Sequence, residues 1–115
     1  MDISVDDGRY VIAVSGGVDS MVLLGMLHRK SGVELIVAHF NHGIRQDAAE
    51  DETLVSQTAK KYGLKLELGR GNLGPRASEE KSRDARYKFL EAVRQKHAAK
   101  AIITAHHQGD LLETA

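Results

Sequence analysis

One short segment decides the fold of this chain: Ser15-Gly16-Gly17-Val18-Asp19-Ser20. The residues before it, Tyr10 to Val14, form a continuous apolar run, which is typical of a strand covered on both faces. The residues after it, Asp19 to Lys30, carry apolar side chains at helical spacing. The two adjacent glycines favour a sharp turn. The pattern therefore predicts a strand, a glycine turn and a helix in direct succession.

The same alternation of strand and helix continues along the chain. We expect further strands at Glu34–His39, Leu64–Leu68 and Ala101–Ala105. We expect further helices at Asp47–Tyr62 and Glu79–His97, and a last one that begins at Gly109 or Asp110 and is cut off at Ala115. Gly69 to Pro75 has the composition of a loop, which we expect to be poorly ordered without substrate. Such alternation implies an α/β fold with a parallel sheet and right-handed crossovers.

Each of the three longer helices is expected to pack an apolar face on the sheet. The residues of these faces are Val22, Leu23, Met26 and Leu27 in the first helix, Leu54, Val55, Thr58, Ala59 and Tyr62 in the second, and Ala85, Phe89, Leu90 and Val93 in the third. The last predicted helix is too short to cover the sheet alone. We therefore expect the chain to be the front part of a longer protein.

Length and composition exclude several classes of protein. A chain of 115 residues can form one domain with a real core. It contains no cysteine, which excludes a disulfide framework, a zinc–thiolate site and a cysteine nucleophile within this stretch, and which fits a cytoplasmic protein. No apolar run approaches the roughly 20 residues that span a bilayer, and the acidic N-terminus is unlike a signal peptide. We expect no membrane partner.

Charge is balanced overall but unevenly distributed. The net charge is −5 over residues 1–59, +7 over residues 60–100 and −2 over residues 101–115. A basic segment can bind a polyanion such as RNA, because Lys and Arg neutralise phosphates. A solvated helix face explains the same charges, and charge alone favours this second interpretation.

The glycine turn is also the strongest chemical signal. Gly16 and Gly17 let the backbone approach a ligand, and the N–H groups at the start of the helix then point at an anion. Ser15 and Ser20 add hydroxyl donors. The segment fits neither the usual P-loop nor the dinucleotide-binding pattern. Asp19 beside phosphates would be repulsive without a cation between them, so it suggests Mg²⁺; the alternative is a tight turn in which Asp19 only completes the helix start.

Four motifs together resemble one known family. The string Ser-Gly-Gly-x-Asp-Ser between a strand and a helix resembles the signature of the PP-loop, or N-type ATP pyrophosphatase, superfamily. Three later stretches narrow the resemblance: HFNHGIR at 39–45, SRDARYKFL at 82–90 and TAHHQGDLLET at 104–114. In this order, from about Tyr10 to Ala115, they look like the N-terminal domain of the tRNA(Ile)-lysidine synthase family.

The resemblance implies a fold and a reaction. The fold is a three-layer, Rossmann-like parallel sheet of the adenine nucleotide alpha-hydrolase type, with strand order 3-2-1-4, truncated before the last strand. Residues 1–115 would be an incomplete N-terminal PP-loop domain, without the family's C-terminal tRNA-recognition domains. In the implied reaction, ATP adenylates C2 of the wobble cytidine of tRNA(Ile) with a CAU anticodon and pyrophosphate leaves. L-lysine then displaces AMP to give lysidine. Formation of a homodimer is left open.

The resemblance also assigns roles to individual residues. ATP would be bound by Ser15, Gly16, Gly17, Val18, Asp19, Ser20 and His39, with Asp19 also holding Mg²⁺. The substrates would be bound by His42, Arg45, His106, His107 and Glu113. The catalytic residues would be Asp19, Arg83, Arg86 and Asp110. A metal site formed by the histidines is the less favoured alternative, because both pairs follow strands, where α/β folds bind ligands.

Elementary chemistry supports some of these roles. Arg83 and Arg86 are three residues apart, hence on one helix face, where either could clamp a phosphate or an RNA backbone, or be merely solvated. Attack by lysine needs a neutral amine, although the unperturbed pKa is about 10.4. Asp110 and Glu113 could accept its proton or orient it. Asp110 as a simple helix cap is the competing interpretation.

The chain departs from the family at one position of the last motif. Many members have two acidic residues where this chain has Gly109 followed by Asp110. Either one acid suffices, or some activity was lost with the first. The alternatives are therefore another PP-loop adenylating enzyme, such as a tRNA thiolase or an amidotransferase-type synthetase, and a degenerate ATP-binding module without turnover.

Overall fold

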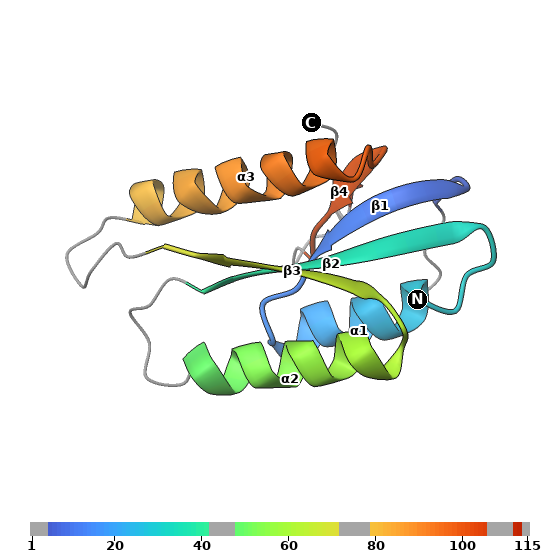
Figure 1. Cartoon of the computed structure of the whole chain (residues 1–115), viewed down its shortest axis with the longest axis horizontal. Helices are drawn as coiled ribbons and strands as arrows, with labels where there is room; N and C mark the ends of the chain where they lie inside the picture. The colour runs from blue at the N-terminus through green and yellow to red at the C-terminus, as the bar shows by residue number, and fades with distance from the viewer. Residues whose placement is uncertain (1–4, 42–47, 72–78, 106–111, 114–115) are drawn as a thin grey trace.

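A twisted sheet forms the middle layer of a three-layer structure (Figure 1). The computed structural model describes residues 5–41, 48–71, 79–105 and 112–113. The strands are β1 (Gly8–Ala13), β2 (Val33–Asn41), β3 (Lys65–Arg70), β4 (Ala101–Ile103) and β5 (Leu112–Glu113). The helices are α1 (Val18–Leu27), α2 (Ala48–Lys61) and α3 (Glu79–Lys96). Among the described helices, none is long and apolar enough to cross a membrane.

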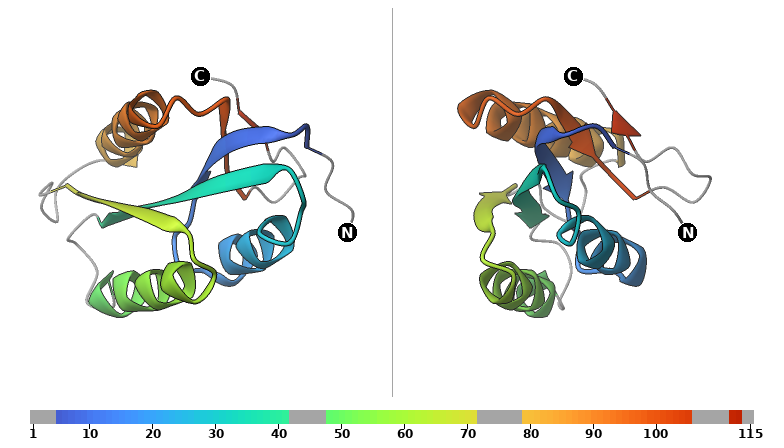
Figure 2. Two further views of the ribbon diagram at one scale, coloured as in Figure 1. Left: turned by 45° about the vertical axis from the view of Figure 1, so that its right-hand side comes forward. Right: turned by 90° about the vertical axis from the view of Figure 1, so that its right-hand side faces the viewer.

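The strand order confirms the prediction from the sequence. The sheet runs β3-β2-β1-β4-β5, and its first four strands are parallel. The connections through α1 and α2 lie on one face of the sheet, and α3 covers the other, as the two turned views show (Figure 2). The direction of winding therefore reverses between β1 and β4. In open α/β sheets this switch point, at the carboxyl ends of the strands, is where ligands bind.

The helix predicted from Gly109 or Asp110 onward is wrong where the structure describes it. Leu112 and Glu113 form β5, which pairs antiparallel with Ile103 and Ile102 of β4. A helix of this length closes few hydrogen bonds for the residues that it orders. The edge of β4 instead offers backbone partners at once.

Two strands extend beyond their predicted ends. β2 continues through His39 to Asn41, and β3 includes Gly69 and Arg70, which the sequence placed in a loop. Gly69 has a packing reason to be there, because a Cβ at this position would lie 2.6 Å from the Phe89 ring of α3. A glycine inside a strand often marks such a close approach. The rest of the predicted loop, residues 72–75, lies outside the described residues.

The core consists of two layers, one on each face of the sheet. The layer beneath α1 and α2 contains Tyr10, Ile12, Val14, Leu23, Leu24, Leu27, Leu35, Val37, Val55, Ala59, Ala101 and Ile103. The layer beneath α3 contains Val11, Ile36, Ala38, Leu90, Val93, Ala99 and Ile102. Alternate residues of β1 and β2 thus enter opposite layers, as the pleat of a strand requires. Both faces being covered explains the continuous apolar run of β1.

Most of the predicted helix faces are buried, with two exceptions. Leu23, Leu27, Val55, Ala59, Leu90 and Val93 are buried, and Met26, Thr58, Tyr62, Ala85 and Phe89 are partly buried. Val22 and Leu54, however, are 53% and 43% exposed, so their predicted inward orientation is wrong. Leu24, two residues after Val22 and hence on the opposite side of α1, is fully buried, and so is Val55, which follows Leu54 in α2.

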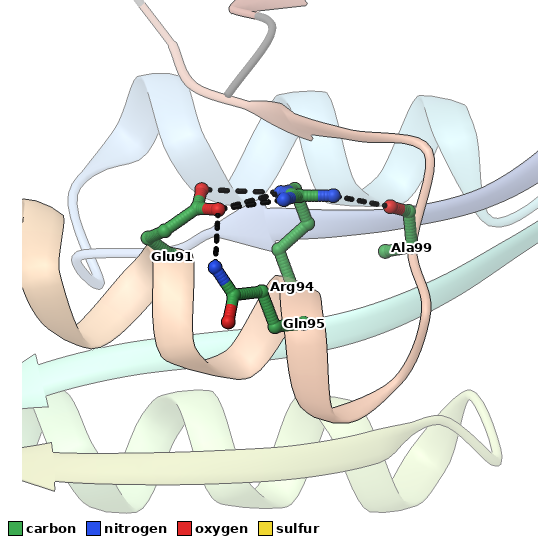
Figure 3. Close-up of polar contacts among 4 residues, drawn as sticks. All are labelled: Glu91, Arg94, Gln95 and Ala99. Carbon is green, nitrogen blue, oxygen red and sulfur yellow. Dashed lines mark hydrogen bonds and ion pairs between the residues drawn. The ribbon is translucent and has the colours of Figure 1, made fainter.

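Ion pairs tie α3 to the amino-terminal edge of the sheet. The Arg9 guanidinium pairs with Glu34 of β2 and donates to the His97 carbonyl at 2.6 Å. At the end of α3, Arg94 binds the Glu91 carboxylate and donates to the Ala99 carbonyl, which fixes the turn into β4 (Figure 3). The hydrogen bond from Arg94 lowers the pKa of Glu91 below its usual range.

Glu67 joins β3 to the carboxyl end of α3. Its carboxylate lies 2.9 Å from the Lys96 ammonium and 2.5 Å from Nε2 of His97. The hydrogen bonds from Lys96 and His97 lower the pKa of Glu67, and they outweigh the opposing effect of its burial. The charged carboxylate is therefore the form that the folded protein favours.

This lowered pKa gives the stability a pH dependence with a definite sign. The contribution of Glu67 is present above the pKa of the unfolded chain and is lost as the pH falls through the lower folded pKa. We expect Glu67→Gln to lower the free energy of unfolding by up to about 1 kcal/mol at pH 7, with a difference that shrinks at acidic pH. Urea denaturation of both proteins from pH 7 down to pH 3 measures this. A constant difference at every pH would contradict the assignment.

Candidate functional site

Hydrogen bonds within the loop fix the turn between β1 and α1. The Ser20 hydroxyl donates to the Gly17 carbonyl at 3.0 Å and accepts from the Ser15 N–H at 3.2 Å. Because the Ser20 proton is used on Gly17, the Ser15 hydroxyl must be the donor in the 3.2 Å contact between the two hydroxyl oxygens. The sequence suggested these hydroxyls as donors to a ligand. In the structure they brace the turn, and Ser15 Oγ also accepts from the Gly17 N–H.

The turn sits at the amino end of α1, where backbone N–H groups lack partners within the helix. Gly17 is the N-cap residue, and α1 begins at Val18, whose side chain is 78% exposed. Asp19 lies in the first turn of α1 and is exposed. The helix start thus presents backbone donors and one carboxylate at the carboxyl-terminal edge of the sheet. This arrangement suits an anion that is accompanied by a cation.

Asp51 of α2 lies directly over Gly16, which the sequence gave no reason to expect. Gly16 has φ +94°, and a Cβ there would lie 3.0 Å from Asp51 Cβ and 3.1 Å from Asp51 Oδ1. The glycine therefore serves both the positive φ and the close approach of α2. Asp51 belongs to the acidic first turn of α2, and no local pattern in the sequence relates it to Gly16.

His39 lies under the same loop. It is the seventh residue of β2 and is 4% exposed. Its Nδ1 lies 2.8 Å from the carbonyl oxygen of Val14, the residue that leads into the turn. A carbonyl can only accept, so Nδ1 carries a proton and is the donor. Nε2 is buried and has no hydrogen-bond partner among the described residues.

Three buried polar side-chain atoms lack a hydrogen-bond partner in the described part of the chain. Within the described residues they are His39 Nε2, Glu52 Oε1 and Arg86 Nε. Glu52 belongs to the first turns of α2 and uses its other oxygen on Arg70, at the end of β3. Arg86 belongs to the first half of α3, which follows the carboxyl end of β3 (Figure 1). Buried polar groups are normally paired, so the unpaired His39 Nε2 beneath the glycine turn and the unpaired Arg86 Nε on α3 each indicate a place where a polar ligand can bind.

The two predicted arginines of α3 meet at one aromatic ring. The guanidinium carbons of Arg83 and Arg86 lie 5.8 Å and 5.2 Å from the centre of the Tyr87 ring. Both distances are within the range of a cation–π interaction. The prediction that the two arginines share one side of the helix is consistent with this geometry.

The remaining predicted site residues cannot be placed. His42, Arg45, His106, His107 and Asp110 lie outside the described residues, and for Glu113 only its position in β5 is described. Within the described part of the chain, no three His, Asp or Glu side chains form a cluster that could hold a metal ion. Mg²⁺ commonly binds through one or two carboxylates and substrate phosphates, so Asp19 alone still fits such an ion.

Comparisons with known proteins agree with this arrangement. A family model described as a PP-loop domain matches residues 2–115. The tRNA(Ile)-lysidine synthase of Streptococcus gordonii is 37% identical over 113 residues, which are 96% of this chain and 26% of that protein. The synthase of Streptococcus mutans is 39% identical over 92% of this chain and 25% of its own length. The synthase of Thermotoga maritima is 33% identical over 96% of this chain and 29% of its own length. The chain thus spans about a quarter of the length of these curated relatives.

A solved structure shares the fold. The U34-tRNA thiolase NcsA from Methanococcus maripaludis, solved with its [4Fe-4S] cluster, superposes with a TM-score of 0.72. The match covers 88% of this chain and 39% of the thiolase, at 19% sequence identity. At this identity the likeness shows the common fold and nothing about the reaction.

The contact between Gly16 and Asp51 can be tested by adding one methyl group. We expect Gly16→Ala to lower the free energy of unfolding by about 1–3 kcal/mol, because Cβ would meet Asp51 and φ is positive. Gly17→Ala is the matched control: φ is −72° there and the nearest atom, Ser15 Oγ, is 3.4 Å away. Urea denaturation compares them. Asp51→Ala should restore part of the loss from Gly16→Ala, and equal losses at both glycines would contradict the contact.

Proposed function

Since the chain belongs to the PP-loop domain family, which uses ATP, we propose that it forms the adenylation site of a tRNA(Ile)-lysidine synthase. The substrates of the proposed reaction are ATP, L-lysine and tRNA(Ile) with a CAU anticodon. The C2 oxygen of the wobble cytidine attacks the α-phosphorus of ATP, and pyrophosphate leaves. The lysine amine then attacks C2 and loses a proton, and AMP leaves with the oxygen. The product is lysidine.

One observation carries this proposal. The braced turn, the start of α1 and His39 meet at the carboxyl-terminal edge of the sheet, beside the switch point between β1 and β4, and Nε2 of His39 has no partner within the described residues. A triphosphate needs backbone donors where negative charge develops on the leaving pyrophosphate. The start of α1 supplies such donors without reorganisation, because Ser20 already holds the turn.

Individual residues have distinct tasks in this proposal. Gly16 and Gly17 bring the backbone to the phosphates, and Ser15 and Ser20 keep that backbone in place. His39 holds Val14 at the entrance of the turn and offers Nε2 to the nucleotide.

Magnesium fits the residues at the start of α1. Asp19 would hold the ion there, and bound Mg²⁺ would neutralise charge on the pyrophosphate. A carboxylate at a phosphate-binding turn is otherwise repulsive to the ligand, which is why Asp19 favours Mg²⁺-bound ATP over ATP alone.

The substrate side of the site remains a proposal from the sequence motifs. His42, Arg45, His106 and His107 would contact the cytidine and its surroundings. Asp110 and Glu113 would accept the proton of the attacking amine or orient it. Arg83 and Arg86 would bind phosphate, which their meeting at Tyr87 supports.

The proposed reaction predicts transfer of labelled lysine. We expect the full-length natural protein that contains this chain to attach labelled lysine to a tRNA(Ile) transcript with a CAU anticodon, with release of pyrophosphate from ATP. The matched control is the methionine tRNA, which has the same anticodon, and which we expect to stay unlabelled. Pyrophosphate release without lysine transfer would indicate another adenylating enzyme. ATP binding without pyrophosphate release would indicate a module without turnover.

The magnesium assignment predicts a change in metal dependence. We expect Asp19→Ala to raise the Mg²⁺ concentration for half-maximal ATP binding by about tenfold or more, because a metal ligand is lost. The fold should stay intact, since Asp19 is an exposed residue in the first turn of α1. Isothermal titration with ATP at several Mg²⁺ concentrations measures the shift, and circular dichroism checks the fold. Asp7→Asn, an exposed carboxylate near the amino end of β1, serves as control; an unchanged Mg²⁺ dependence in Asp19→Ala would refute the metal role.

A further inference from the structure

Tyr87 brings two positive charges together near one ring. Arg83 and Arg86 lie 5.8 Å and 5.2 Å from its centre, so their guanidinium carbons can be no farther apart than these two distances added together. A phosphate group beside the ring can accept hydrogen bonds from both guanidinium groups, because each presents several donors in a fixed geometry.

The ring itself is held in place from below. Tyr87 is partly buried and packs on the core layer that includes Leu90 and Val93. Two residues further along α3, the Phe89 ring packs on Phe40 at a centroid distance of 5.6 Å. The first half of α3 is thus seated on the sheet, and Tyr87 is a fixed surface against which long, flexible arginine side chains can be ordered.

Arg86 carries an unmet hydrogen-bond donor. Its Nε is buried and has no partner among the described residues. By contrast, Arg94 of the same helix uses Nε and both terminal nitrogens on Glu91 and on the Ala99 carbonyl (Figure 3). An arginine whose N–H groups all have protein partners stabilises the fold. A buried arginine N–H without a protein partner indicates a ligand that carries acceptor oxygens.

We propose that Tyr87 is a positioning residue, whose ring holds the guanidinium groups of Arg83 and Arg86 as a paired binding site for a phosphate group. Tyr87 itself need not touch the ligand. The inference deepens the proposed function and rests on it, because the phosphate comes from one of its two phosphate-bearing substrates. These are the triphosphate of ATP and the backbone of the RNA.

The test compares two substitutions at Tyr87 in the full-length protein. Tyr87→Leu removes the ring but keeps an apolar side chain on the core, and Tyr87→Phe keeps the ring. We expect Tyr87→Leu to weaken binding of Mg²⁺-ATP or of the tRNA transcript about three- to tenfold, and Tyr87→Phe to restore it. Titration with each ligand separately identifies which substrate supplies the phosphate.

Salt dependence separates positioning from a loss of structure. For the affected ligand, Tyr87→Leu should also reduce the slope of log Kd against log salt, because a phosphate contact is lost. Arg94→Gln is the matched control, because it also removes a cation from α3. The Arg94 guanidinium already donates to Glu91 and to the Ala99 carbonyl, so we expect ligand binding to be unchanged. If Tyr87→Leu fails to fold, a double variant with Arg83→Lys and Arg86→Lys replaces it. This variant keeps both charges but loses the planar guanidinium groups, so we expect it to weaken ligand binding by the same factor.

The outcomes are distinct. If the wild-type protein binds both ligands and Tyr87→Leu binds them equally well, the inference is wrong and the proposed function stands. The same holds if Tyr87→Phe weakens binding as much as Tyr87→Leu. A wild-type protein that binds neither ligand would remove the proposed function, and this inference with it.

Discussion

The hydrogen bond from the Ser20 hydroxyl to the Gly17 carbonyl closes the turn on which the rest of the site depends. The turn ends β1 and aims α1 across the sheet, so its conformation fixes where the backbone donors of α1 point. His39 supports it from β2 and Asp51 from α2. Three elements that are distant in sequence therefore converge on one short loop. A ligand that binds there meets a conformation that exists before it arrives, which lowers the entropic cost of binding.

The two edges of the sheet differ in how their polar groups are paired. At the amino-terminal edge, Arg9, Glu34, Glu67 and the end of α3 satisfy one another in pairs. At the carboxyl-terminal edge, His39, Glu52 and Arg86 each have one buried atom without a partner in the part of the chain that the structure describes. Among the described residues, the carboxyl-terminal edge thus has paired groups such as Glu52 with Arg70 and also keeps some hydrogen-bonding capacity unmet. Such a difference is expected where structure and function draw on the same few layers.

Local signals in the sequence predicted much of this arrangement, and long-range packing explains what they missed. The apolar run of β1, the glycine pair and the helical spacing predicted a parallel α/β sheet, because parallel topology follows from alternation and the handedness of crossovers. The strand order came from the family resemblance. The contact of Asp51 with Gly16 joins residues that no local pattern relates. The exposure of Val22 and Leu54 depends on which part of a broad apolar face meets the sheet. Gly69 looked like a loop residue because only the ring of Phe89, from another element, explains its place in β3.

That same ring has a consequence for how the surface of this domain can diverge. Phe89 lies against the bare backbone of Gly69, so α3 can approach the sheet this closely only while position 69 has no side chain. Arg86 lies about one turn earlier on the same rigid helix. A larger residue at position 69 would require the Phe89 ring or α3 itself to shift, and a shift of the helix would carry that guanidinium with it. A position in β3 therefore limits how closely α3 can pack on the sheet, and with it where the side chains along that helix lie.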